Sequence, residues 1–205
     1  PEHRPLDADQ AYRHTIVLDR GYPVRNDITA ESAHAALATA VCERPLNWLS
    51  ERGSVKLMIY AHGGLNSESD AISRIRVMAP YALANGIYPL FISWRTGALE
   101  TVSDMAEEWA TKFGLGVRGG PRAKGWLDRI TEGTDRMLEP VLRAPGGAMW
   151  GQMKLNAERA STAEQGGVRL MVPHLKALQK HLPQLEIHLI GHSAGSIVLG
   201  SMLKQ

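Results

Sequence analysis

Five consecutive residues have the types and spacing of a nucleophile turn: Gly191-His192-Ser193-Ala194-Gly195. Glycines two positions away on each side of a serine let the chain turn sharply and leave room for neighbouring backbone. An apolar segment, 185–190, precedes this motif, and a segment with helical character, 196–203, follows it. A G-x-S-x-G motif acts in this strand-to-helix setting. We therefore expect Ser193 to attack the carbonyl carbon of an acyl compound.

The backbone around Ser193 also predicts a site that stabilises negative charge. Ala194 begins the expected helix, so its N–H lies where the helix dipole favours a developing oxyanion. A second donor is expected from a loop that follows an earlier strand. His62-Gly63-Gly64-Leu65 directly follows the apolar run 55–60 and meets that condition. The two signals are far apart in the sequence and predict the same chemistry.

Three apolar runs predict the strands that position these loops, namely 55–60, 87–93 and 185–190. A helix is expected between the first two, beginning near Ser67 and ending at Asn85-Gly86, with a kink or division at Pro80. Its first-turn acids, Glu68 and Asp70, are interpreted as capping residues. Strand, helix and strand with short connections form a βαβ unit, which predicts an α/β fold with a parallel sheet flanked by helices.

The remaining segments complete one incomplete domain that spans residues 1–205. A strand over 14–18 and a helix over 29–49 that breaks at Pro45 precede the βαβ unit. Glycines and prolines divide the stretch that follows 96 into helical pieces, which predicts a lid-like helical insertion. We expect the core to occupy about 10–96 and 167–205, and the insertion to occupy about 97–166.

Through the His62-Gly63-Gly64 segment, the G-x-S-x-G motif and the β-α-β order that links them, the chain resembles the α/β-hydrolase superfamily. The resemblance covers residues 55–205 apart from the insertion. It implies that Ser193 is the nucleophile and that Ala194 N–H is one oxyanion donor. The N–H of Gly64 or Leu65 is the other, and the choice between them stays open. The supporting positions of the two motifs are His62, Gly63, Gly191, His192 and Gly195.

The sequence departs from the superfamily pattern in the order of its catalytic residues. In that pattern an acid and then a histidine follow the serine, but none of the twelve residues after Ser193 is Asp, Glu or His. His62 belongs to the oxyanion segment and His192 is held in the turn, so neither is a good base. We expect the acid and base to lie outside this chain, on missing C-terminal strands, and residues 1–205 alone to be inactive.

Composition excludes several other classes of protein. Lys and Arg number 23 against 21 Asp and Glu, and the basic residues are scattered, so no nucleic-acid partner is expected. No apolar run approaches the roughly 20 residues of a membrane span. The single Cys42 cannot form an internal disulfide, which favours a cytoplasmic protein. Neither a zinc-binding spacing nor a phosphate-binding glycine loop is present, so no metal and no cofactor are expected.

The leading hypothesis is a serine hydrolase acting on a small-molecule or lipid carboxylic ester through an acyl-enzyme on Ser193. Transfer of the acyl group to an alcohol or amine instead of water stays open. Trp94 follows a strand at the edge of the sheet where ligands bind, so it is a candidate substrate contact. The alternative is a noncatalytic α/β-hydrolase-like module whose helical insertion binds a ligand or a protein partner.

Overall fold

The computed structural model describes residues 4–24, 35–63, 67–95 and 135–205, with residues 135–146 described by their backbone. The chain divides into two compact units, residues 1–96 together with 154–205, and residues 97–153. The first unit contains the sheet. Of the predicted insertion, residues 97–134 lie outside the described residues. Its backbone is described from residue 135 onward. Among the described helices, none has the length and apolar character that crossing a membrane requires.

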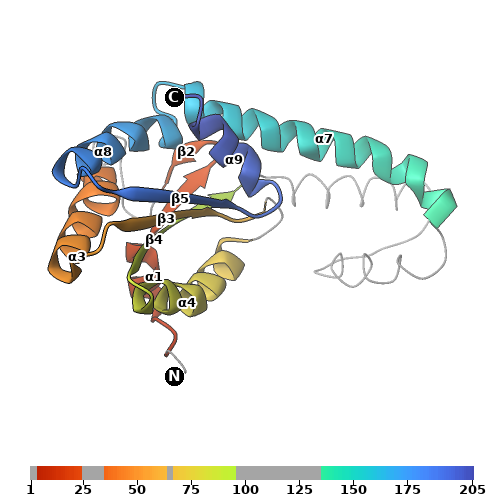
Figure 1. The fold of residues 1–205 in the computed structure, drawn as a ribbon. Coiled ribbons are helices and arrows are strands. Elements are labelled where there is room, and N and C mark those ends of the chain that lie inside the picture. Colours follow the sequence, from red (N-terminus) through yellow and green to blue (C-terminus); the bar gives the residue numbers. More distant parts are fainter. Residues whose placement is uncertain (1–3, 25–34, 64–66, 96–134) are drawn as a thin grey trace. The chain divides into compact units, whose positions relative to one another are not determined.

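A five-stranded sheet forms the centre of the first unit (Figure 1). Its strands are β1 (Thr15–Asp19), β2 (Tyr22–Pro23), β3 (Lys56–Ala61), β4 (Ile87–Arg95) and β5 (Glu186–Gly191). Their order is β2-β1-β4-β3-β5, and every neighbouring pair is parallel except β1 with β2. The predicted α/β fold with a mostly parallel sheet flanked by helices is confirmed.

β3 and β4 occupy apolar runs that are buried in the sheet, whereas the apolar run of β5 is largely exposed. β4 lies between β1 and β3, and its residues from Tyr88 to Trp94 are all buried, as expected for a parallel strand covered on both faces. The β1–β2 connection is a two-residue hairpin in which Arg20 and Gly21 have φ of 50° and 95°. Positive φ at both central residues is the geometry of a primed hairpin turn.

Helices begin and end where caps and glycines occur. They are α1 (Ala8–Arg13), η1 (Thr39–Glu43), α3 (Arg44–Arg52), α4 (Glu68–Ala84), α7 (Asp135–Thr162), α8 (Gly167–His181) and α9 (Gly195–Met202). The Ser67 side chain caps α4 by accepting the Asp70 N–H at 3.1 Å. Gly53 ends α3 with φ of 59°.

The prediction for Pro45 is wrong, and the prediction for Pro80 is narrowed. The expected break at Pro45 is absent, because Pro45 lies in the first turn of α3, where its missing N–H is not required, and the π-helical turn η1 leads directly into it. Pro80 does not divide α4, which is one helix from Glu68 to Ala84. Pro80 lies four residues before the last residue of that helix and removes only its own backbone N–H. A kink at Pro80 stays a prediction.

Helices cover both faces of the sheet and close the core. Figure 1 shows α1 and α4 on one face, and α8 and α9 on the other. The first face holds a buried cluster that joins Met58 of β3 and Phe91 of β4 to the inner side of α4. On the other face, Met171, Leu175 and Leu178 are buried at helical spacing along α8. This packing fixes the strand ends from which the predicted site residues project.

Candidate nucleophile site

The predicted nucleophile lies in a tight turn between β5 and α9. β5 ends at Gly191 and α9 begins at Gly195, so three residues make the connection. Ser193, the central one, has φ of 53°, in the left-handed region that few non-glycine residues adopt. Such strain is retained where the surrounding structure enforces it, and it is common at functional sites. Its side chain is exposed, so the hydroxyl is accessible to a substrate.

Both glycines of the motif are required by close backbone contacts. A Cβ at Gly191 would lie 2.6 Å from Ser196 Cα, and a Cβ at Gly195 would overlap the carbonyl oxygen of Ala61. The same Ala61 oxygen accepts the N–H of His192 at 3.0 Å. The turn therefore packs directly on the end of β3, and a side chain at Gly195 would force it away. A side chain at Gly191 would instead collide with the start of α9.

The N-terminal turn of α9 leaves Ala194 N–H available. The carbonyl oxygens of Ser193 and Ala194 accept hydrogen bonds from Ser196 and Ile197, both at 3.0 Å. In the part of the chain that the structure describes, no oxygen accepts the N–H of Ala194 itself. A buried N–H at the start of a helix is suited to bind an anion, which is the role predicted for it.

Gly63, which follows His62 after the end of β3, lies beside the nucleophile turn. A Cβ at Gly63 would lie 3.2 Å from His192 Nδ1 and 3.5 Å from Ser193 Cβ. The backbone of Gly63 therefore lies against the turn, and the absence of a side chain at this position allows the close approach. Gly64 and Leu65, the alternative second donors, lie outside the described residues, so their role stays a prediction.

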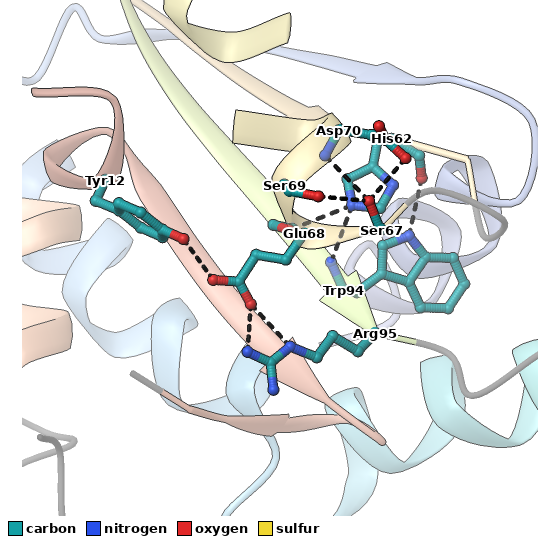
Figure 2. Close-up of polar contacts among 9 residues, drawn as sticks. Tyr12, His62, Ser67, Glu68, Ser69, Asp70, Trp94 and Arg95 are labelled. Atoms are coloured by element: carbon teal, nitrogen blue, oxygen red, sulfur yellow. Dashed lines mark hydrogen bonds and ion pairs between the residues drawn. The ribbon is translucent and has the colours of Figure 1, made fainter. Parts of the chain in front are cut away.

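His62 is buried and its ring bonds to two neighbouring segments (Figure 2). Its Nδ1 lies 2.5 Å from the carbonyl oxygen of Gly63. Its Nε2 accepts the backbone N–H of Trp94 at 3.2 Å and lies 3.4 Å from Ser93 Oγ. Burial lowers the pKa of His62 below its ordinary value, the bond to the Gly63 carbonyl acts in the opposite direction, and Arg74 and His192 lower it further. Both ring nitrogens already have hydrogen-bond partners.

Trp94 lies beside the site with its polar group already engaged. Its side chain is 3% exposed, and its indole Nε1 donates to the carbonyl oxygen of His62 at 2.8 Å. It lies inside β4, one position before the last residue of the strand, rather than after the strand as the sequence predicted. Contact with a substrate stays a prediction for this residue.

No general base contacts the nucleophile within the described residues. Ser193 Oγ has no hydrogen-bond partner among these residues. The ring of His14 is instead bonded to the carbonyl oxygen of Pro89 in β4. His188 pairs with Glu186 at 3.6 Å on β5. The structure thus brings together Ser193, Ala194, Gly63 and His62 but not an acid and a base. The described residues also contain no group of three or more His, Cys, Asp or Glu that could hold a metal ion.

Sequence reasoning missed a polar network next to the site, drawn in Figure 2. Glu68, at the start of α4, accepts the Tyr12 hydroxyl at 2.6 Å and the Arg95 Nε–H at 2.8 Å. The bond to Glu68 raises the pKa of Tyr12 to about 12 and also raises that of Arg95. These partners belong to α1, α4 and β4, so no local spacing in the sequence could indicate them. Asp70 does take part in the cap, because Ser67 Oγ donates to it at 2.7 Å.

Comparison with known proteins finds no matching family model, no matching curated protein and no matching solved structure.

Proposed function

We propose that the protein is a serine hydrolase that cleaves a carboxylic or lipid ester through an acyl-enzyme on Ser193. The observation that carries the proposal is the backbone of Ser193, which has a φ of 53° between two glycines that admit no side chain. Glycine would adopt this backbone conformation with less strain, yet the residue at the exposed tip of the turn is a serine, which carries a hydroxyl. Further support comes from Gly63 beside the turn and from the N–H of Ala194, which has no acceptor among the described residues and could stabilise a tetrahedral intermediate.

The reaction follows from this arrangement. A base takes the proton from Ser193 Oγ as the oxygen attacks the ester carbonyl carbon, and the carbonyl oxygen becomes an oxyanion. Ala194 N–H, with Gly64 or Leu65 N–H, stabilises that charge. The carbon–oxygen bond to the alcohol then breaks, and the alcohol leaves with the proton that the base returns. Water attacks the acyl-enzyme in the same way and releases the acid.

The acid and base come, in this proposal, from polypeptide outside residues 1–205. Two observations support it: no described side chain bonds to Ser193 Oγ, and among the described strands β5 pairs only with β3. The side chains of Ile187 and Ile190 on β5 are 37% and 45% exposed, although a parallel strand is usually covered on both faces. A further parallel strand beside β5 would bring its carboxyl end to the same sheet edge as Ser193.

The test is labelling of the full-length protein with a fluorophosphonate probe, together with turnover of a p-nitrophenyl ester. We expect the probe to label the wild type and Ser201→Ala, a control serine on α9, but not Ser193→Ala. Mass spectrometry of the labelled peptide should place the adduct on Ser193. A folded full-length protein that is not labelled at Ser193 would reject the hydrolase proposal.

The second candidate is a noncatalytic module that binds a ligand or a protein through its helical insertion. This candidate is favoured because no described base contacts Ser193 Oγ. A protein that has lost catalytic activity can keep the fold and its serine turn without keeping the proton acceptor. It predicts that the full-length protein lacks Ser193-dependent turnover of the ester and that Ser193→Ala leaves binding of its partner unchanged.

A further inference from the structure

Ser196, in the first turn of α9, bonds twice to the residue predicted to be the nucleophile. Its backbone N–H donates to the carbonyl oxygen of Ser193 at 3.0 Å, and its hydroxyl donates to the same oxygen at 2.7 Å. A carbonyl oxygen has two lone pairs, so both acceptor positions of the Ser193 carbonyl are occupied. A serine in a helical turn can bond back to a carbonyl three residues earlier, and here that carbonyl belongs to the residue with a left-handed backbone.

The Ser193 carbonyl and the Ala194 N–H belong to one peptide group. A peptide group is planar, so a contact that fixes the direction of its carbonyl also fixes the direction of its N–H. The Ala194 N–H has no acceptor among the described residues and is one of the predicted oxyanion donors. The two bonds from Ser196 therefore act on the group that would stabilise the negative charge, although Ser196 bonds only to its opposite side.

Ser196 is itself held against the end of β5. A Cβ at Gly191 would lie 2.6 Å from Ser196 Cα and 2.7 Å from Ser196 N, so the missing side chain of Gly191 allows this close approach. The next N–H of the helix, that of Ile197, donates to the Ala194 carbonyl and not to Ser193. In the part of the chain that the structure describes, Ser196 is thus the one residue that donates to the Ser193 carbonyl.

We propose that Ser196 is a positioning residue for the oxyanion hole: its hydroxyl and its N–H fix the Ser193 carbonyl, and through the shared peptide group they hold the Ala194 N–H in one orientation. The inference rests on the proposed hydrolase function, which it extends by a side chain that does not touch the reacting atoms.

The backbone of Ser193 explains why such support is needed. Its φ of 53° is unfavourable for a residue with a side chain, and a strained residue keeps such a conformation only where its surroundings enforce it. Relaxation by rotation of the following peptide group would turn the Ala194 N–H away from its place. A donor stabilises a developing charge most when it is already in position before the reaction. The Ser196 hydroxyl supplies one of the two bonds that oppose this rotation.

Three variants of Ser196 in the full-length protein separate the hydroxyl from the size of the side chain. Ser196→Thr keeps a hydroxyl that can bond to a carbonyl three or four residues earlier, whereas Ser196→Val has the same shape without it, and Ser196→Ala removes the hydroxyl alone. We expect the threonine variant to keep kcat within about twofold of wild type. The valine and alanine variants should lose about three- to tenfold in kcat with KM changed less than about twofold, because one hydrogen bond that positions a donor is lost. Ser201→Ala, farther along α9, is the control and should keep the wild-type kcat.

Equal kcat for Ser196→Ala and wild type would overturn the proposal. An equal loss in the threonine and valine variants would also overturn it, because the effect would then follow the shape of the side chain and not its hydroxyl. Circular dichroism melting shows whether each variant is folded.

NMR relaxation of the Ala194 amide tests the same inference without any activity. The ¹⁵N order parameter of this N–H should be about 0.85 in wild type and in Ser196→Thr, as in rigid backbone, and lower in Ser196→Ala. An unchanged order parameter in the alanine variant would overturn the proposal. If the alanine variant does not fold, a wild-type value below about 0.6 would overturn it, since the N–H would then not be held. A wild type that is not labelled at Ser193 rejects the hydrolase function separately from this measurement.

Discussion

His62 and Trp94 bond to each other twice, through the Trp94 N–H to the imidazole Nε2 at 3.2 Å and through the indole N–H to the His62 carbonyl oxygen at 2.8 Å. We predict that Trp94→Phe, which removes the second bond and leaves a buried carbonyl without its donor, lowers the free energy of unfolding by about 1–3 kcal/mol. Urea denaturation measures the change. Trp150→Phe is the control, because that side chain is 46% exposed and its loss should cost less than about 0.5 kcal/mol. Equal stability of Trp94→Phe and wild type would contradict the prediction.

The two glycines of α9 should respond oppositely to alanine. Gly195→Ala places a methyl group on the Ala61 carbonyl oxygen, which cannot withdraw without disturbing β3, so a loss of about 1–3 kcal/mol is expected. Gly200→Ala places the same methyl group where no atom lies within 4 Å, in a helix where alanine is favoured by about 0.5–1 kcal/mol. Thermal melting of both variants gives the signs, and a stable Gly195→Ala would show that the turn packs less closely on β3.

The protein with serine at position 193 should have a lower free energy of unfolding than the protein with glycine there. A non-glycine residue in the left-handed region costs about 1–2 kcal/mol, and glycine relieves that cost. We therefore predict that Ser193→Gly is more stable than Ser193→Ala by about 1 kcal/mol, although neither variant can be labelled by a fluorophosphonate. Urea unfolding of the two variants compares them directly. Identical midpoints would mean that the turn relaxes out of the left-handed conformation when the hydroxyl is removed.

Stability should fall on the acid side because of two buried histidines. Burial lowers the pKa of His14 and of His62, so the folded protein binds fewer protons than the unfolded chain just below the ordinary histidine pKa. The contribution is complete above about pH 6.5 and is lost as the pH falls through that range. The urea midpoint should drop between about pH 7.5 and pH 5. In His14→Asn, which keeps a donor toward Pro89, the drop should be smaller, and an unchanged slope would exclude His14 as a cause.

Glu68→Gln should separate charge from hydrogen bonding in the network with Tyr12. The pKa of Tyr12, raised to about 12, should fall toward its ordinary value when the carboxylate is replaced by an amide. Because the folded-state pKa is the higher one, this bond stabilises the fold fully below about pH 10, and the contribution is lost as the pH rises toward 12. Ultraviolet titration of phenolate absorption compares the variant with wild type. Glu186→Gln, on an exposed carboxylate, is the control that should leave the titration unchanged.

Local features of the fold could be predicted from the sequence. The runs around Leu57 and Leu90 form strands because a buried parallel strand needs a continuous apolar segment. The run around Leu189 also forms a strand, although most of its residues are exposed. The turn at Ser193 was also predictable, since its glycines are required by contacts within a few residues and by the next strand. Pro45 was misread because a proline in the first turn of a helix and a proline that breaks one look alike in sequence.

Contacts between distant segments could not be predicted. Nothing near Glu68 indicates that Tyr12 and Arg95 converge on it, because that pairing exists only after α1, α4 and β4 are packed. His62 was assigned to the oxyanion segment from its neighbours in sequence, but its tautomer depends on Trp94, on another strand. The acid and base of the proposed reaction stay predictions for the same reason, as no described side chain approaches Ser193 Oγ.

The exposed edge of β5 has a practical consequence for handling the protein. Within the described residues no strand pairs with the outer edge of β5, and such an edge presents N–H and C=O groups on which another molecule can add a strand. Ile187 and Ile190 add apolar surface beside it. We expect residues 1–205 produced alone to associate as their concentration rises, with soluble yield limited by this edge rather than by the stability of the core. Dilute, cool conditions and a charged substitution such as Ile190→Lys should increase recovery, which light scattering of purified material would show.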